Sequence, residues 1–240
     1  MNIKELMDRV LFALSVPKCV ACGKRLDYGQ KALCHECSTE FCDFKTRECA
    51  RCARVLSKCS CVTPYLKAHF IGRVVKCFRY INRKEMTAGN SLIYSLKKDN
   101  RADVLERCAD ELEVAIRNCV RFPENYIFTN VPRRKAAIVK YGIDHSELLA
   151  KELAKRFDAE YLKLLKSNAK REQKSLEPSD RLKNADFDAI GSVDLGGREV
   201  IIVDDIITTG ASMASAATII RSLGCKSITA VALAIAYKDQ

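Results

Sequence analysis

Beyond residue 65, apolar runs with strand spacing alternate with runs that repeat at helical spacing. The clearest helix covers residues 102–120, where Val104, Cys108, Leu112 and Ile116 fall on one face. Other helices are predicted over residues 86–97, 144–154 and 211–223, and strands over residues 69–75, 126–131, 160–165, 200–203 and 227–236. This alternation predicts an α/β fold, with a mostly parallel sheet and flanking helices on both faces.

The amino-terminal quarter has a different pattern. Residues 2–16 repeat apolar positions at helical spacing, and we expect this helix to pack against the rest of the chain. Cysteines then dominate up to Cys61, and the composition changes from Thr63, with Pro64 at the probable boundary. We therefore expect two units, an amino-terminal helix with a cysteine-rich module over residues 1–64 and the α/β domain over residues 65–240.

Nine of the thirteen cysteines lie between Cys19 and Cys61. Cys19 and Cys22 form one Cys-x-x-Cys pair, and Cys34 and Cys37 form another after eleven intervening residues. Two such pairs are typical of a zinc knuckle or ribbon, because each tight turn presents two thiolates to one tetrahedral ion. We expect a structural zinc site here, with buried free thiols as the alternative. His35 lies inside the second pair and is a competing ligand, although a solvent-facing position is the simpler interpretation.

A second set consists of Cys49 and Cys52, followed by Cys59 and Cys61. The Cys-x-Cys spacing of its second half is tighter than usual, so the sequence predicts one or two zinc ions in total. Cys42 is left over, and the spacing also permits interleaved pairing between the two sets. The remaining cysteines are scattered and are expected to be small apolar core residues: Cys77, Cys108, Cys119 and Cys225.

Candidate ligand-binding residues follow the most apolar strand, residues 200–203. Asp204 and Asp205 come first, and a run of small and hydroxyl residues then opens a helix: Thr208, Thr209, Gly210, Ala211 and Ser212. Ligands bind at the carboxyl ends of strands in open α/β sheets, and a helix amino terminus suits a phosphate. The carboxylates can bind vicinal sugar hydroxyls or a divalent cation. The alternative to a ligand-binding site is an ordinary strand followed by a capped helix.

Basic residues suggest an anionic ligand. Arg133, Arg134 and Lys135 follow the strand over residues 126–131 and can neutralise a pyrophosphate. The basic segment 166–184 fits either a mobile flap over the site or a plain solvated loop. The net charge of +11 points to phosphorylated small molecules or nucleic acid, or else to a solubilising surface.

Targeting signals are not evident. No apolar run approaches the roughly twenty residues that a membrane span requires, and charges interrupt the first ten residues. The sequence therefore predicts a cytoplasmic protein without a membrane span.

The stretch from residue 199 to residue 213 resembles the phosphoribosyl pyrophosphate (PRPP) motif of type I phosphoribosyltransferases. An apolar strand, an Asp-Asp pair and a Thr-Thr-Gly-Ala-Ser loop follow in the order that the motif has. The resemblance implies that Thr208 to Ser212 hold the 5-phosphate, and that Asp204 and Asp205 lie along the ribose hydroxyls.

Nearly the whole chain resembles the ComF family, the competence-associated branch of the phosphoribosyltransferase superfamily. The resemblance rests on the cysteine pairs, on Pro132 with the basic residues after it, on the PRPP-type loop, and on a segment that includes Gln173, Lys174, Ser175, Leu176, Arg181 and Asn184. One segment departs from the family pattern. Where the family commonly has Arg-Gly-Phe-Asn-Gln, this chain has Tyr-Gly-Ile-Asp-His over residues 141–145.

This resemblance implies binding of PRPP with magnesium and transfer of ribosyl 5-phosphate to an unidentified acceptor, with Arg133, Arg134 and magnesium stabilising the leaving pyrophosphate. His145 is a candidate base, although a histidine in the first turn of a helix is more often a surface residue. The alternatives are a non-catalytic sensor of PRPP or nucleotides, and a protein that binds single-stranded DNA or competence proteins. The resemblance selects neither the acceptor nor the oligomeric state. A redox switch in the thiol cluster is a further alternative, which bound zinc would mask.

Overall fold

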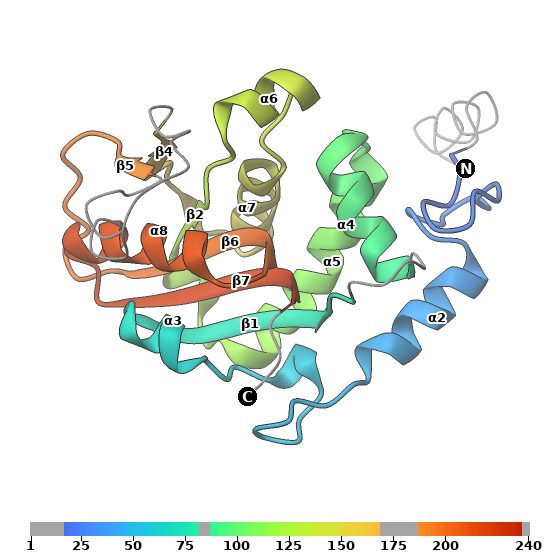
Figure 1. Ribbon diagram of the computed structural model, residues 1–240, viewed down its shortest axis with the longest axis horizontal. Coiled ribbons are helices and arrows are strands. Elements are labelled where there is room, and N and C mark those ends of the chain that lie inside the picture. The colour runs from blue at the N-terminus through green and yellow to red at the C-terminus, as the bar shows by residue number, and fades with distance from the viewer. Residues whose placement is uncertain (1–16, 82–86, 169–186, 237–240) are drawn as a thin grey trace, which may run out of the picture.

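A five-stranded sheet forms the centre of the computed structural model, which describes residues 17–81, 87–168 and 187–236 (Figure 1). Every pair of neighbouring strands is parallel, as the sequence predicts. In spatial order the strands are β1 (Ile71–Arg79), β7 (Ser227–Ile235), β6 (Glu199–Ile207), β2 (Ile127–Asn130) and β3 (Glu160–Tyr161). The carboxyl ends of all five strands therefore lie at the same edge of the sheet.

Helices cover both faces of this sheet. One face packs against α2 (His35–Lys45), α4 (Ala88–Lys98), α5 (Ala102–Cys119) and α7 (His145–Arg156). The other face packs against α3 (Pro64–Ala68) and α8 (Ala211–Ser222), and α8 lies across β6 and β7 in Figure 1. Strand β6 serves both cores, because Ile201 and Val203 enter the first and Val200 and Ile202 the second. A strand that is buried on both faces has a continuous run of apolar residues in its sequence, as β6 does.

The strand expected over residues 160–165 is wrong in extent. Strand β3 ends at Tyr161, and β4 (Leu165–Ser167) belongs to a separate antiparallel pair with β5 (Phe187–Ala189). Leu164 and Leu165 leave the edge of the main sheet and pack with Phe187 in the α8-side core. The apolar run therefore reflects burial rather than one continuous strand.

Short helices were not predicted in three places. Helix α2 begins within the second cysteine pair, α3 begins at Pro64, and α6 (Lys135–Tyr141) follows the basic residues after β2. Two 3-10 turns complete the described elements, η1 (Leu56–Lys58) and η2 (Pro123–Asn125). Only Cys37 and Phe41 of α2 are buried, and α3 and α6 are too short for helical spacing to be distinctive.

Some expectations lie outside the described residues. They are the helix over residues 2–16 and most of the basic segment 166–184, with the ComF-like residues between 173 and 184. Among the helices that the structure describes, none combines the length and apolar character needed to cross a bilayer.

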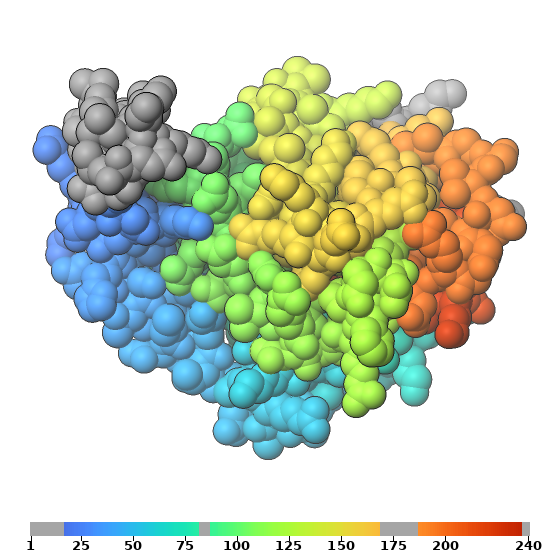
Figure 2. All heavy atoms as spheres, turned by 180° about the vertical axis from the view of Figure 1, so that it is seen from behind, coloured from blue at the N-terminus to red at the C-terminus, as the bar shows by residue number. Residues whose placement is uncertain are grey.

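The cysteine-rich part packs against the α/β part over a broad contact. Figure 2 shows its blue-to-cyan chain lying along the side and base of the green helices. Phe41 of α2 meets Phe78 of β1 edge to face, with ring centroids 5.2 Å apart. Gly89 of α4 lets the backbone approach this pair, because a Cβ there would lie 2.8 Å from a ring carbon of Phe78. The division near residue 64 stays a prediction, at the point where Pro64 begins α3.

Candidate functional site

The PRPP-like loop joins the carboxyl end of β6 to the amino terminus of α8. Thr208 and Thr209 are exposed, and Gly210 precedes the first helical residue, Ala211, with a φ of 85°. Gly210 is required twice over, because its φ lies in the left-handed region and a Cβ would come 2.8 Å from Cδ2 of Leu66. The loop thus has exposed hydroxyls beside a helix amino terminus, a geometry suited to an anion.

The two aspartates before the loop have different environments. Asp205 is 4% exposed, and its Oδ2 lies 2.7 Å from Nζ of Lys97 and 3.4 Å from Nε2 of His145. Neither contact has hydrogen-bond angles, so Oδ2 is a buried acceptor that lies close to one ammonium and one imidazole but receives no hydrogen bond from the described residues. Lys97 stands at the end of α4, and sequence patterns gave no sign that it reaches this carboxylate.

Asp204 is partly exposed, and its Oδ1 accepts a hydrogen bond from the backbone N–H of Asp205 at 2.8 Å. Burial raises the pKa of Asp204 to about 7, the charge of Lys97 opposes the rise, and Asp144 adds to it. Lys97 therefore acts on both members of the pair, by direct contact with Asp205 and by its field on Asp204. Burial lowers the pKa of Lys97, Asp204 opposes this, and the nearby Arg133 adds to the lowering.

His145 is buried, and the expectation of a surface position was wrong. It is the first residue of α7, whose amino terminus lies against β6 at the edge formed by the carboxyl ends of the strands. Burial lowers the pKa of His145 to about 4, with further lowering from Arg133 and Lys97. The imidazole is therefore neutral at pH 7. Neither ring nitrogen has a hydrogen-bond partner among the described residues.

Arg133 connects the elements around this cluster. Its backbone N–H donates to Asp144 Oδ2 at 2.9 Å, and its guanidinium donates to the carbonyls of Lys97 and Ile143 at 3.1 and 3.3 Å. The guanidinium also lies 4.7 Å from the ring centroid of Tyr141. The segment over residues 141–145, which departs from the ComF pattern, thus surrounds Arg133.

Arg134 differs from its neighbour because it is exposed at the start of α6. Of the two arginines predicted to bind pyrophosphate, Arg134 is the one open to solvent in this structure. Asp144 caps α7, accepting from the backbone N–H of Glu147 at 3.2 Å, as the capping-box pattern predicts.

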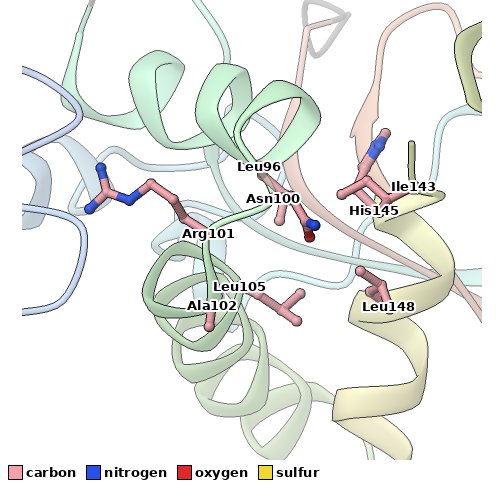
Figure 3. Close-up of a pocket in the computed structure, with 8 residues that line it drawn as sticks. All are labelled: Leu96, Asn100, Arg101, Ala102, Leu105, Ile143, His145 and Leu148. Carbon is pink, nitrogen blue, oxygen red and sulfur yellow. The ribbon is translucent and has the colours of Figure 1, made fainter. Parts of the chain in front are cut away.

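A cavity of about 140 Å³ lies between α4, α5 and α7 (Figure 3). Leu105 and Leu148 extend into it from facing helices, whereas the ring of His145 points away from them. Leu96 adds to an aliphatic lining. Asn100, Arg101 and His145 also line the cavity, and His145 links it to the acidic pair through its contact with Asp205.

The cysteines form two clusters, and in each the four sulfurs lie within 4.8 Å of one another. The first cluster contains Cys19, Cys22, Cys34 and Cys37, and the second contains Cys49, Cys52, Cys59 and Cys61. Interleaved pairing is thereby excluded. Cys42 and His35 are exposed, and neither belongs to a cluster.

The first half of each cluster has the same turn. In the first, Gly23 N–H donates to Cys19 O and Cys19 N–H donates to Lys24 O. In the second, Ala53 and Arg54 make the corresponding bonds with Cys49. The fifth residue has a positive φ in both, 76° at Gly23 and 54° at Ala53. The repeated turn holds each Cys-x-x-Cys pair for binding to one ion.

Thiol chemistry favours an ion in each cluster. Burial and the neighbouring thiols raise the pKa of Cys61 to about 12, and burial and neighbouring thiols also raise the pKa of Cys37. Four ionised sulfurs at this separation repel one another unless a cation lies between them. The donor set and spacing fit tetrahedral zinc, whose bonds to sulfur are about 2.3 Å long.

Comparisons with known proteins agree with this architecture. Residues 144–240 match the family model for the phosphoribosyl transferase domain. Competence protein F of Haemophilus influenzae is 26% identical over 229 residues, which cover 90% of this chain and 96% of that protein.

A second relative matches a shorter part of the chain. The ribose-phosphate pyrophosphokinase of Pyrococcus abyssi is 45% identical over 84 residues, or 35% of this chain, and the match spans only 26% of that enzyme's length. Among solved structures, a purine phosphoribosyltransferase from Pyrococcus horikoshii aligns with 55% of this chain and 72% of its own, with 18% identity and a TM-score of 0.34.

Proposed function

Because the chain is a ComF-like protein of phosphoribosyltransferase type, we propose that it binds PRPP with Mg²⁺ and transfers ribosyl 5-phosphate to a nucleophilic acceptor. The observation that carries this proposal is the acidic pair, Asp204 and Asp205, directly before an exposed hydroxyl loop at the amino terminus of α8. A sugar phosphate needs those two features side by side.

In this proposal, different residues bind the 5-phosphate, the ribose and the pyrophosphate of PRPP. Thr208 to Ser212 bind the 5-phosphate through backbone N–H groups and hydroxyls. Asp204 and Asp205 accept hydrogen bonds from the ribose hydroxyls. Arg134, Arg133 and Mg²⁺ neutralise the pyrophosphate.

The reaction is a displacement at the anomeric carbon. The bond from this carbon to pyrophosphate breaks, a bond to the acceptor forms, and the acceptor loses its proton. Positive charge develops on the sugar, and the carboxylates beside the ribose stabilise it. The neutral ring of His145, 3.4 Å from Asp205, is a candidate to receive the acceptor's proton.

Calorimetric titration with PRPP, with and without Mg²⁺, tests the binding step. We expect a dissociation constant in the micromolar range, on the order of −8 kcal/mol, that requires Mg²⁺ and disappears in an Asp204→Ala, Asp205→Ala double variant. Asp43→Ala is a matched control, because Asp43 is an exposed carboxylate on α2. Equal heats from wild type and the double variant would refute the proposal.

A PRPP sensor without catalysis is the second candidate. The contacts of Arg133 favour it, because this guanidinium already donates to two backbone carbonyls. Release of pyrophosphate from bound PRPP over a range of nucleophiles separates the two functions. A sensor binds PRPP and releases none, whereas a transferase releases pyrophosphate only with its acceptor.

We also propose that each cysteine cluster binds one structural Zn²⁺, since four thiols converge in each. Elemental analysis of the purified protein should give two zinc ions per chain. Cys22→Ser and Cys59→Ser, one in each cluster, should each reduce this number to one. Retention of both ions in either variant would contradict the assignment.

We propose in addition a role in natural competence and DNA uptake, which the likeness to Competence protein F supports. The net charge of +11 supports contact with single-stranded DNA or with an acidic competence protein. Binding of a labelled oligonucleotide should weaken steeply as salt is added. If the oligonucleotide does not bind even at low salt, the proposed DNA function is refuted and PRPP remains the proposed ligand.

A further inference from the structure

Lys76 is a fully buried lysine on β1, the strand at the edge of the sheet nearest the second cysteine cluster. Its side chain is 1% exposed. Its Nζ donates to Cys59 Sγ at 3.1 Å, to the carbonyl of Cys61 at 3.1 Å and to the carbonyl of Val74 at 3.3 Å. Three acceptors therefore use all three ammonium hydrogens.

Within the part of the chain that the structure describes, the Cys59 sulfur is the hydrogen-bond partner of this ammonium that can carry a negative charge. Among the residues that the structure describes, no carboxylate pairs with Lys76, and both carbonyl partners are neutral. Burial of an ammonium is costly unless an opposite charge accompanies it. A Cys59 thiolate supplies that charge, so the position of Lys76 is favourable when Cys59 is ionised.

Bound metal is what keeps Cys59 ionised. A divalent ion with four thiolates retains a net negative charge, and Cys59 itself is 0% exposed. A buried cation beside such a site offsets the remaining charge. Loss of the ion leaves the ammonium beside neutral thiols, in a place that water does not reach.

Among the described residues, the first cluster has no buried lysine against a sulfur, although its Cys19, Cys34 and Cys37 are buried. Cys22 is exposed, and the nearby Lys24 forms an exposed ion pair with Glu36 at 3.3 Å. Solvent screens charge at that position. The two clusters share their ligand set but differ in how the charge of the site is balanced.

We propose that Lys76 is an outer-shell cation of the second metal site and couples metal binding there to the packing of β1. Lys76 is a positioning residue, because it acts through Cys59 and touches no substrate. The inference rests on the proposed binding of zinc by the second cluster.

The test compares zinc affinity in wild type, Lys76→Met and Lys58→Met by competition with a chromophoric chelator. Lys58 is an exposed lysine directly before Cys59, so its replacement removes the same charge without a buried contact. We expect Lys76→Met to weaken one of the two sites by about 10- to 100-fold, with the other site unchanged, and Lys58→Met to leave both as in wild type. Equal affinities in folded Lys76→Met and wild type would overturn the proposal.

Urea unfolding with and without zinc distinguishes the proposed role of Lys76 from a purely structural one. In excess chelator, Lys76→Met should unfold at a higher urea concentration than wild type, because its buried charge is gone. With zinc the order should reverse. The same order under both conditions would refute the coupling.

Hydrogen exchange of the wild-type protein covers the case in which Lys76→Met does not fold. Removal of zinc should speed exchange in β1 at residues 74–78, whereas Cys22→Ser, which empties the first site, should not. Unchanged protection of β1 after zinc removal would overturn the inference. A wild-type protein that never holds a second ion would instead refute the zinc assignment itself.

Discussion

Lys76 and Lys97 are two lysines that each contact an ionisable group, and they differ in access to solvent. Lys97 is 35% exposed in its side chain and pairs with Asp205 at 2.7 Å, at the edge where the ligand loop lies. Lys76 is 1% exposed and pairs with Cys59 at 3.1 Å, under the second cluster. The same charge chemistry thus occurs once in an open site and once in a sealed one.

The difference in exposure indicates a difference in use. An ion pair that solvent reaches can rearrange when a ligand brings its own charges, and the charge of Lys97 can then turn towards phosphate. A sealed pair cannot rearrange without exposing an ammonium to an apolar core. We therefore associate Lys97 with an exchangeable ligand and Lys76 with a permanent ion.

Breaking the sealed pair should have the largest effect. Cys59→Ser removes both a metal ligand and the anionic partner of Lys76, and we expect a loss of about 3–5 kcal/mol in the free energy of unfolding. Cys22→Ser in the first cluster should cost less, because it leaves no buried charge. Urea denaturation in the presence of zinc measures both. An equal or greater loss in Cys22→Ser would remove the distinction between the clusters.

Breaking the open pair should affect ligand binding instead. Lys97→Met removes a charge-assisted contact, and we expect PRPP and Mg²⁺ to bind about 10- to 100-fold more weakly, as for a hydrogen bond to a charged group. Zinc content should stay at the wild-type value. Calorimetry gives the affinity, with the exposed neighbour Lys98→Met as control. Unchanged affinity in Lys97→Met would show that its charge does not serve the ligand.

The pH dependence of binding sharpens the comparison, because the open site contains a carboxyl group that titrates near neutrality. The pKa of Asp204 is about 7, and in the proposed binding mode its ionised form accepts hydrogen bonds from ribose. Affinity for PRPP and Mg²⁺ should therefore rise about tenfold from pH 6 to pH 8. Asp204→Asn should bind weakly with a flatter profile, and a wild-type profile that falls with pH would contradict this assignment.

The raised pKa of Asp204 also determines how folding stability changes with pH. A carboxyl group whose pKa is higher in the folded protein than the usual 3.8 binds protons more tightly when folded. Stability is then lost as pH rises from about 4 to 7. Asp204→Asn should reduce that loss, as urea denaturation across this range would show.

The smallest effect is expected at the exposed lysine of the first cluster. Lys24→Ala removes an ion pair in which both side chains are exposed, and such pairs contribute little. We expect the urea midpoint and both zinc affinities to stay at their wild-type values. A measurable drop in zinc affinity would mean that an exposed lysine also supports its cluster, and that burial is not the deciding difference.

Local sequence was sufficient for the main elements. The apolar run over residues 200–203 and the small residues after it predicted β6, the loop and α8, because strand burial and helix initiation are encoded within a few positions. The cysteine spacings also predicted the two groups of four thiols, although they left interleaved pairing open. Asp144 was identified as the cap of α7 from its spacing to Glu147.

Tertiary structure decided which charges meet. Lys97, His145 and Asp205 come from α4, α7 and β6, and no local pattern relates them. Lys76 lies in β1, where sequence gives no sign that a thiol from the cysteine-rich part will face it. Burial of His145 depends on where α7 begins relative to the sheet edge. Elements are set by neighbouring residues, whereas the burial and pairing of a charge depend on segments that only folding brings together.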